Sequence, residues 1–283
     1  MESISVSPGP MSHDSDPFDS TPLFAIHDAR VRREGKDILK VDDFVLNQGE
    51  HIALLGPNGA GKSTFIKLLT REVLPLYRDN PPVRFMGNPR PSLVDIRRYF
   101  GVVSATMQDQ VSVHLPAREI VCGGLFGTLG VPAEMNLKPT QEQWSRTMQV
   151  MEELGIGSLA GRDVLTLSSG QLRRVLVARE LVSNPQALIF DEPCTGLDPE
   201  GMYYLRETMR KLAAAGKSII VVTHYPEDII PAVKRVLLIK DAAIYADGSK
   251  DEILVDEVMT KMFGVPIAVE HRDGWYSLRG VYE

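Results

Sequence analysis

The sequence is short of cysteine, of long apolar runs and of excess charge. Its 283 residues include only two cysteines, Cys122 and Cys194, without a C-x-x-C spacing, so neither a disulfide framework nor a zinc site is predicted. The longest apolar stretches are strand-sized, well below the roughly 18 residues of a membrane-spanning helix. A net charge of −6 gives no indication of nucleic-acid binding. Since the start also lacks a secretory signal pattern, a cytosolic protein is expected.

Residues 1–22 differ in composition from the rest of the chain. They contain four acidic residues, four prolines and six serines but no Lys or Arg. Such a stretch cannot bury enough apolar area to offset chain entropy, so we predict a disordered acidic tail. One large domain is expected over residues 23–264, followed by a short C-terminal extension over residues 265–283.

From Leu23 onward, short apolar runs alternate with longer helical patterns. Continuous apolar runs are typical of parallel strands that are covered on both faces. The alternation predicts an α/β domain with a mostly parallel sheet. The expected strands are residues 23–31, 37–46, 51–56, 187–190 and 218–223, with a strand-like run at 236–248.

Helical spacing follows several of these strands. Residues 63–73 have helical apolar spacing, and residues 201–216 predict a helix closed by Gly216. The segment from about 105 to 175 contains no strong strand and is predicted to be a mainly helical insertion. Its Gly-rich stretch, residues 122–130, is either a flexible apolar docking surface or a loop with a packed helix end.

The strongest local motif is GPNGAGKST, which fits G-x-x-x-x-G-K-[ST] between a predicted strand and a predicted helix. Its glycines let successive backbone N–H groups point into one concavity that binds phosphate oxygens. Lys62 places its charge on the β- and γ-phosphates, and Ser63 offers its hydroxyl to Mg²⁺. The predicted nucleotide phosphate site comprises Gly56, Pro57, Asn58, Gly59, Ala60, Gly61, Lys62, Ser63 and Thr64.

An acidic pair follows a buried strand in ALIFDEP. Asp191 and Glu192 stand at the carboxyl end of that strand, where α/β sheets place their ligand sites. Asp191 can hold Mg²⁺, and Glu192 can orient the attacking water or accept its proton. Alone, such a pair fits a surface turn as well, but after a phosphate-binding loop it becomes a candidate catalytic pair.

The stretch LSSGQLRR, together with the preceding motifs and DEPCTGLD, resembles the nucleotide-binding subunits of ATP-binding-cassette (ABC) proteins. LSSGQ is similar to the LSGGQ signature of that family, with Ser169 in place of the first glycine. A small, Gly-containing turn before a helix is another anion-binding helix N-terminus. A plain helix cap by Ser168 or Ser169 is the alternative interpretation. The candidate signature residues are Ser168, Ser169, Gly170 and Gln171.

The resemblance covers about residues 23–256 and implies a P-loop NTPase fold. Its mostly parallel central sheet is accompanied by an N-terminal antiparallel β part and a helical insertion that carries the signature. In the family, two subunits pair head to tail and enclose two ATP molecules. Each ATP lies between the P-loop of one subunit and the signature turn of the other. Asp198 matches the D-loop at the dimer interface, and His224 matches the switch histidine that contacts the γ-phosphate.

Two family features are less clear. The glutamine that reaches Mg²⁺ falls in register at Ala105, and we favour Gln108 over Gln110 for that role, with a solvated loop glutamine as the alternative. The aromatic residue that stacks on adenine is replaced by Arg33, whose planar guanidinium can stack on a base or lie in solvent. Cys194 is interpreted as a small packed side chain rather than a redox-sensitive thiol.

The resemblance implies an ATPase that uses ATP and Mg²⁺ and powers an ABC transporter, with Lys62, Glu192 and His224 as its catalytic residues. The expected partners are a second ABC subunit, forming a homodimer, and a separate integral membrane subunit, with no nucleic acid. The protein is expected in the cytoplasm, at the inner face of the cell membrane. The alternative is a soluble single-cassette ABC ATPase in assembly or repair.

Overall fold

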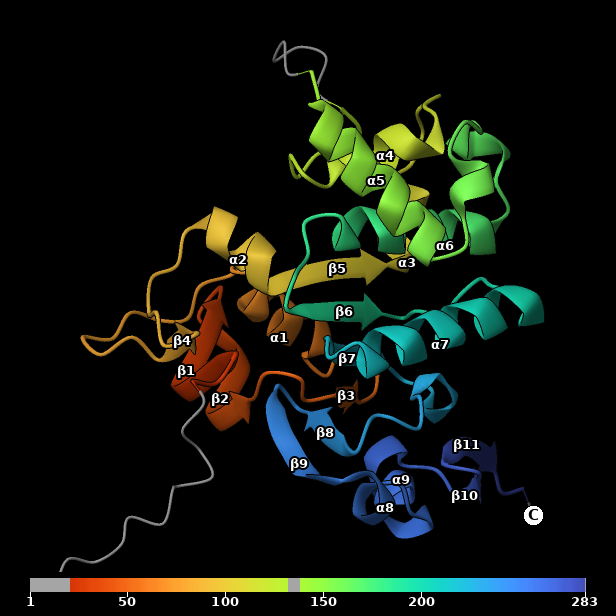
Figure 1. The fold of residues 1–283 in the computed structure, drawn as a ribbon. Helices are drawn as coiled ribbons and strands as arrows, with labels where there is room; N and C mark the ends of the chain where they lie inside the picture. Colours follow the sequence, from red (N-terminus) through yellow and green to blue (C-terminus); the bar gives the residue numbers. More distant parts are fainter. Residues whose placement is uncertain (1–20, 132–137, 283) are drawn as a thin grey trace, which may run out of the picture.

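The computed structural model describes residues 21–131 and 138–282. The tail predicted for residues 1–22 therefore lies almost entirely outside the described residues. Figure 1 shows a central sheet with helices grouped around it. Its nine strands run in the order β4-β1-β2-β9-β8-β3-β7-β6-β5, and β10 and β11 form a separate hairpin. The sheet strands are β1 Phe24–Arg33, β2 Lys36–Leu46, β3 Ile52–Leu55, β4 Val83–Phe85, β5 Phe100–Ser104, β6 Ala187–Asp191, β7 Ser218–Thr223, β8 Arg235–Lys240 and β9 Ala243–Ser249.

The middle of the sheet is parallel. β3 pairs in parallel with β7 and β8, and β6 pairs in parallel with β5 and β7. Alternate side chains of these strands enter two different apolar cores, one with β1, β2 and α1 (Lys62–Leu69) and one with α6 (Ser169–Leu181) and α7 (Pro199–Ala214). Both faces are therefore covered, which explains the continuous apolar runs in the sequence and confirms the predicted fold class.

The antiparallel part lies at one end of the sheet, where β1 pairs with β2 and β4. It packs on the core beside α1. That helix is shorter than expected, because it ends at Leu69 rather than continuing to residue 73. Arg71 has a left-handed backbone with φ of 57°, which a continuing α-helix cannot accommodate.

Helices dominate the described residues between β5 and β6. Figure 1 shows α4, α5 and α6 together at one end of the molecule, in yellow and green. A Cβ at Gly124 would overlap the carbonyl oxygen of Arg179 on α6, so this part of the Gly-rich stretch is closely packed backbone. The elements between these strands are α3 Ala105–Asp109, α4 Ala117–Gly123, α5 Gln141–Glu153, two 3₁₀ turns (η2 Gly157–Leu159 and η3 Val164–Thr166) and α6, whereas α2 (Leu93–Tyr99) precedes β5.

The strand-like run at 236–248 is two antiparallel strands, β8 and β9, rather than one. Asp241 and Ala242 form the turn between them, with φ of 51° and 61°. After α8 (Lys250–Ile253) and α9 (Asp256–Phe263), the hairpin of β10 (Ile267–Arg272) and β11 (Trp275–Gly280) packs back on the domain. Its Leu278 N–H donates to Glu227 in the short 3₁₀ turn η4 (Pro226–Asp228).

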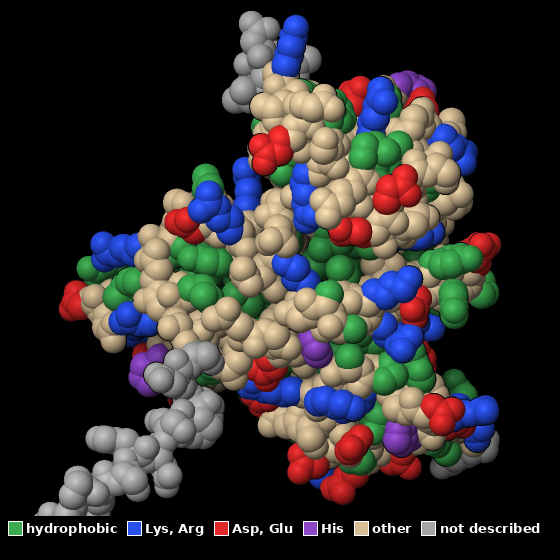
Figure 2. Space-filling view, viewed as in Figure 1, with side chains coloured by type: hydrophobic (Ala, Val, Ile, Leu, Met, Phe, Trp, Pro, Cys, Tyr) green, Lys and Arg blue, Asp and Glu red, His purple; other side chains and the backbone are tan. Residues whose placement is uncertain are grey.

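The surface shows mixed charge. In Figure 2, Lys and Arg side chains are interspersed with Asp and Glu over the face that is drawn. Within residues 21–131 and 138–282, no helix combines the length and apolar character needed to cross a bilayer.

We expect Gly56→Ala to destabilise the fold by about 1–3 kcal/mol, a typical cost of overpacking. Gly56 directly follows β3, and a Cβ there would overlap the backbone carbonyl of Ile239 on β8. Thermal unfolding without nucleotide measures the effect. The control is Gly161→Ala, because a Cβ at Gly161 meets open space. Equal unfolding temperatures for the two variants would contradict the close contact between β3 and β8.

Candidate functional site

The predicted site residues meet at one edge of the sheet because three parallel strands end there. β7 lies between β3 and β6. Leu55 at the end of β3 is level with Thr223 of β7, and Asp191 at the end of β6 is level with Val222. The segments that follow these strands are the phosphate-binding loop, the acidic pair and His224, which therefore share the ligand-binding edge of an α/β sheet.

The loop between β3 and α1 forms a phosphate cradle. Gly61 precedes α1 with φ of 112°, and the start of the helix has no side-chain cap. Its first N–H groups are thus available to an anion. The Lys62 side chain folds over its own loop, where Nζ donates to the carbonyl oxygens of Gly56 at 2.6 Å and Pro57 at 3.2 Å. Burial lowers the pKa of Lys62, against the opposing effect of Glu192 and Asp191.

A pocket of about 750 Å³ opens in front of this cradle. It brings together ten of the residues predicted from the sequence: Arg33, Asn58, Gly59, Ala60, Gly61, Lys62, Ser63, Thr64, Asp191 and Glu192. Sequence reasoning missed six further lining residues: Lys36, Asp37, Ile38, Thr106, Asp241 and Ala242. The last two form the β8–β9 turn, and Ala242 N–H donates to Ala60 at 3.0 Å. A turn signal between two apolar strands was the only local indication of that contact.

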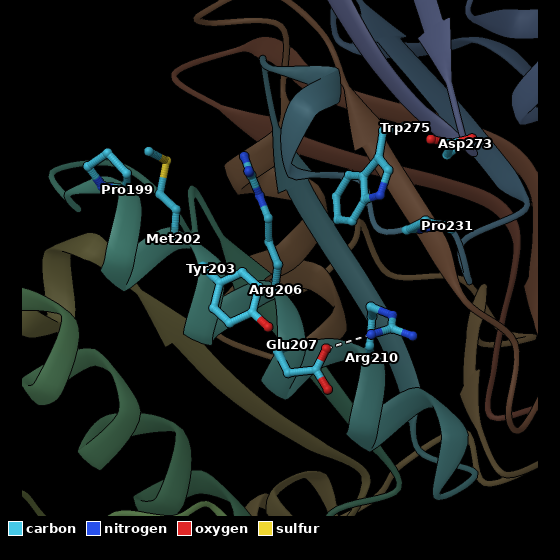
Figure 3. Close-up of a pocket in the computed structure, with 9 residues that line it drawn as sticks. All are labelled: Pro199, Met202, Tyr203, Arg206, Glu207, Arg210, Pro231, Asp273 and Trp275. Carbon is cyan, nitrogen blue, oxygen red and sulfur yellow. Dashed lines mark hydrogen bonds and ion pairs between the residues drawn. The ribbon is translucent and has the colours of Figure 1, made fainter.

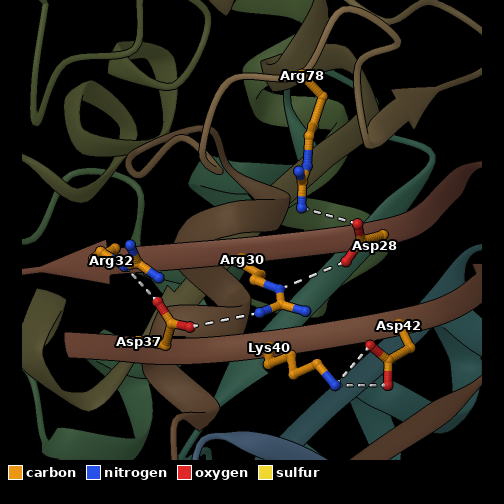
Figure 4. Close-up of polar contacts among 7 residues, drawn as sticks. All are labelled: Asp28, Arg30, Arg32, Asp37, Lys40, Asp42 and Arg78. Atoms are coloured by element: carbon orange, nitrogen blue, oxygen red, sulfur yellow. Dashed lines mark hydrogen bonds and ion pairs between the residues drawn. The ribbon is translucent and has the colours of Figure 1, made fainter. Parts of the chain in front are cut away.

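The outer wall of the pocket is the hairpin between β1 and β2. Figure 4 shows its cross-strand ion pairs, in which Asp37 contacts Arg32 at 2.6 Å and Arg30 at 4.0 Å. The hydrogen bond from Arg32 lowers the pKa of Asp37. Arg33, next in the chain, is 79% exposed at the pocket mouth and its guanidinium is 3.9 Å from Glu34. These partly exposed ion pairs link the two strands of the hairpin, and the exposed Arg33 lines the same pocket as the apolar Ile38.

The residues present suit a magnesium ion. Burial raises the pKa of Asp191, with a further increase from Glu192 and a decrease from Lys62. A half-buried carboxylate of this kind is stabilised by a cation, and Ser63 lines the same pocket. Across residues 21–131 and 138–282, no cluster of three or more His, Cys, Asp or Glu could hold a metal. Mg²⁺ typically binds one or two protein oxygens together with oxygens of substrate phosphates. Asp191 and Ser63 line this pocket beside the phosphate-binding loop and would supply the protein oxygens.

Glu192 and His224 contact each other at the sheet edge. His224 Nδ1 lies 2.9 Å from Glu192 Oε1, and each side chain is 27% exposed. Glu192 has a left-handed backbone with φ of 52°, and its N–H donates to Val222 at 2.8 Å. Backbone in this region costs about 1–3 kcal/mol at a non-glycine residue and is concentrated at functional sites. The turn aims the Glu192 carboxylate at the pocket and at the imidazole.

Gln108 lies elsewhere. It belongs to α3, and its side-chain carbonyl accepts a hydrogen bond of 2.9 Å from Arg173 Nε, whereas Thr106 is the α3 residue that lines the pocket. Arg173 is 2% exposed and also donates to the carbonyl oxygens of Pro193 at 2.7 Å and Thr195 at 3.4 Å. For Gln108 to reach a metal in the pocket, it must leave Arg173.

The signature turn forms a second, smaller pocket of about 300 Å³. Ser168 caps α6, because its hydroxyl accepts from Gln171 N–H while the Gln171 side chain accepts from Ser168 N–H. Ser168, Gly170, Gln171 and Asp198 line this pocket, whereas Ser169, the first residue of α6, does not. Sequence reasoning missed the other lining residues, Gly155, Arg174, Glu200, Gly201 and Tyr204.

Asp198 and Gly170 connect the signature turn with the D-loop segment. Asp198 caps α7 by accepting from Gly201 N–H at 2.8 Å. A Cβ on Gly170 would stand 3.0 Å from Gly201 Cα, so the two helices approach closely at this point.

Cys194 lies beneath the site. It is 8% exposed, and burial together with the negative charge of Asp228 raises the pKa of its thiol to about 12. A thiol that stays protonated at neutral pH reacts slowly, which favours the packed side chain over a redox-sensitive one.

The chain is similar to known proteins throughout this region. A sequence profile of the ABC transporter family matches residues 39–195. An uncharacterised ABC transporter ATP-binding protein of Bacillus subtilis, YlmA, is 30% identical over 249 residues, which are 87% of this chain and 93% of that protein. The Nod factor export ATP-binding protein I of Burkholderia lata is 32% identical over 242 residues, which are 84% and 75% of the two chains.

A solved structure is also similar to this chain. The structure of cbiO1 from Clostridium perfringens, part of the ABC transporter complex cbiONQ, has a TM-score of 0.70 at 25% identity. The likeness covers 85% of this chain and 94% of that one.

The raised pKa of Asp191 predicts that its charge destabilises the nucleotide-free fold. The unfolded carboxyl titrates near a pKa of about 3.9, below its folded value, so stability falls as pH rises through that interval. We expect Asp191→Asn to raise Tm at about pH 7.5, with a gain that shrinks toward about pH 4. Thermal unfolding without nucleotide or divalent cation measures this, with the exposed Asp79→Asn as control. A gain that grows toward acid pH would contradict it.

Proposed function

Because the chain belongs to the ABC transporter family, as an ATP-binding subunit that hydrolyses ATP to power transport, we propose that two copies complete each other's nucleotide sites head to tail. One observation carries the proposal. The P-loop pocket and the signature pocket share no lining residue, which supports their assignment as two separate half-sites of one chain. Both present phosphate-binding groups at a helix N-terminus. A second copy that places Ser168 and Gly170 over the partner's P-loop would enclose the phosphates.

The loop between β3 and α1 would bind the phosphates of the nucleotide. Lys62 would exchange the carbonyl oxygens of Gly56 and Pro57 for phosphate oxygens, which brings its charge to the transferred group. The backbone N–H groups at the start of α1 add fixed dipoles. Ser63 and Asp191 would hold Mg²⁺, which neutralises charge on the phosphate oxygens. Arg33, which lines the pocket, would stack its guanidinium on the nucleotide base.

Glu192 and His224 would act in the hydrolysis step. Glu192 would orient a water molecule toward the γ-phosphorus and accept its proton as the bond to the β-phosphate oxygen breaks, giving ADP and phosphate. His224 contacts the same carboxylate and would hold the γ-phosphate in line with the water. Gln108 would join the metal site after release from Arg173.

We further propose that a separate integral membrane protein is the transport partner, and that the chain works at the cytoplasmic face of the membrane. The relatives support this, since one is named for Nod factor export and cbiO1 is part of a transporter complex. The alternative is a soluble ABC ATPase in assembly or repair, which the second experiment below distinguishes.

The first test is Glu192→Gln. We expect this variant to bind MgATP without turning it over and to accumulate as a dimer, because the neutral amide keeps the site's shape but cannot accept a proton. Light scattering after size exclusion, with and without MgATP, measures the dimer. Glu257→Gln, which alters only an exposed ion pair with Lys261, is the control and should hydrolyse ATP normally. ATP turnover by Glu192→Gln at the wild-type rate would contradict the assignment of Glu192 as the group that accepts the proton from water.

The second test identifies the partner. Affinity-tagged Glu192→Gln, expressed in its native cells, is isolated from detergent-solubilised membranes with MgATP and examined by mass spectrometry. We expect a multi-span membrane protein in stoichiometric amount. Recovery only from the soluble fraction, alone or with soluble proteins, would favour the non-transport alternative.

A further inference from the structure

A buried carboxylate lies directly behind the switch histidine. Asp228, in the turn η4, is 3% exposed. Its Oδ2 accepts a hydrogen bond of 2.9 Å from the Thr223 hydroxyl, and its Oδ1 is 3.4 Å from Arg206 Nη2 on α7. A carboxylate in such a place is costly unless it is paired and hydrogen-bonded, so its contacts hold these groups together.

The Thr223 hydroxyl is used twice. It donates to Asp228 and also accepts from the N–H of Tyr225 at 3.0 Å. His224 lies between these two residues, so its backbone is held on both sides. The imidazole then meets Glu192 Oε1 on one side, and its ring centroid is 3.8 Å from that of Tyr225. The chain on either side of His224 is therefore joined through a hydroxyl whose residue does not line the nucleotide pocket.

Arg206 connects this turn to the far side of α7. Its guanidinium lies 5.6 Å from the ring centroid of Trp275, on β11. Figure 3 shows both side chains at a cavity of about 700 Å³ between α7 and the C-terminal hairpin. Because α7 begins at Asp198, the same helix carries the D-loop cap at its start and the partner of Asp228 two turns later.

We propose that Asp228 and Thr223 are positioning residues for the switch histidine: Asp228 orients the Thr223 hydroxyl, which sets His224 against Glu192, and Arg206 ties the turn to α7. This inference rests on the proposed function of Glu192 and His224. It assigns a role to two buried side chains that do not contact the nucleotide.

The test removes the hydroxyl without changing the shape. Thr223→Val should lower kcat by about 10- to 100-fold, the loss expected from a small misplacement of a catalytic group, with the KM for ATP within about twofold. Thr223→Ser restores the hydroxyl and should recover most of kcat. The matched control is Thr208→Val, because Thr208 is buried on α7 and its hydroxyl donates to the Tyr204 carbonyl oxygen in its own helix.

A double-mutant cycle with His224→Ala separates positioning from general damage. If Thr223 acts through His224, adding Thr223→Val to His224→Ala causes no further loss of kcat. Additive losses of kcat in the double variant, or equal kcat for Thr223→Val and Thr208→Val, would overturn this inference and leave the proposed function intact. A normal kcat for His224→Ala would instead overturn the proposed role of His224, and the inference with it. Tm of every variant shows that each is folded.

Discussion

The parallel pairing of β3, β7 and β6 is the constraint on which the site depends. It places a buried lysine and two carboxylates at one edge of the sheet, where burial lowers the pKa of Lys62 and raises that of Asp191. Lys62 bonds the carbonyl oxygens of its own loop. Both pKa shifts disfavour the charged forms of these groups, which phosphates and a cation would stabilise. Nucleotide binding and stability are therefore coupled through the same charges.

Much of this edge could be predicted from the sequence, since its signals are local. The glycine pattern of the phosphate loop, the acidic pair after ALIF and His224 after SIIVVT each follow a buried strand, and parallel strands end together. The shortened α1 and the β8–β9 turn were harder to predict. They depend on left-handed residues such as Arg71 and Ala242, which side-chain periodicity does not report.

Tertiary partners account for the other differences. The sequence names Gln108 as a metal candidate, but its carbonyl bonds Arg173, 65 positions later in the chain. Likewise, Asp228 contacts Arg206 on α7, 22 positions earlier in the chain. Neither contact has a motif of its own. The tertiary partners of single side chains at buried positions are therefore the hardest feature to predict from the sequence pattern.

Arg173 shows how the helical part is joined to the catalytic edge. It lies in the signature helix, yet its acceptors are Gln108 on α3 and the carbonyl oxygens of Pro193 and Thr195, just after Glu192. Burial lowers its pKa, and these neutral oxygens hold the charge. Any displacement of α6 must carry or break these bonds, because a buried guanidinium cannot lose its acceptors without a large cost. One buried side chain of the signature helix thus joins that helix to the loop that follows Glu192.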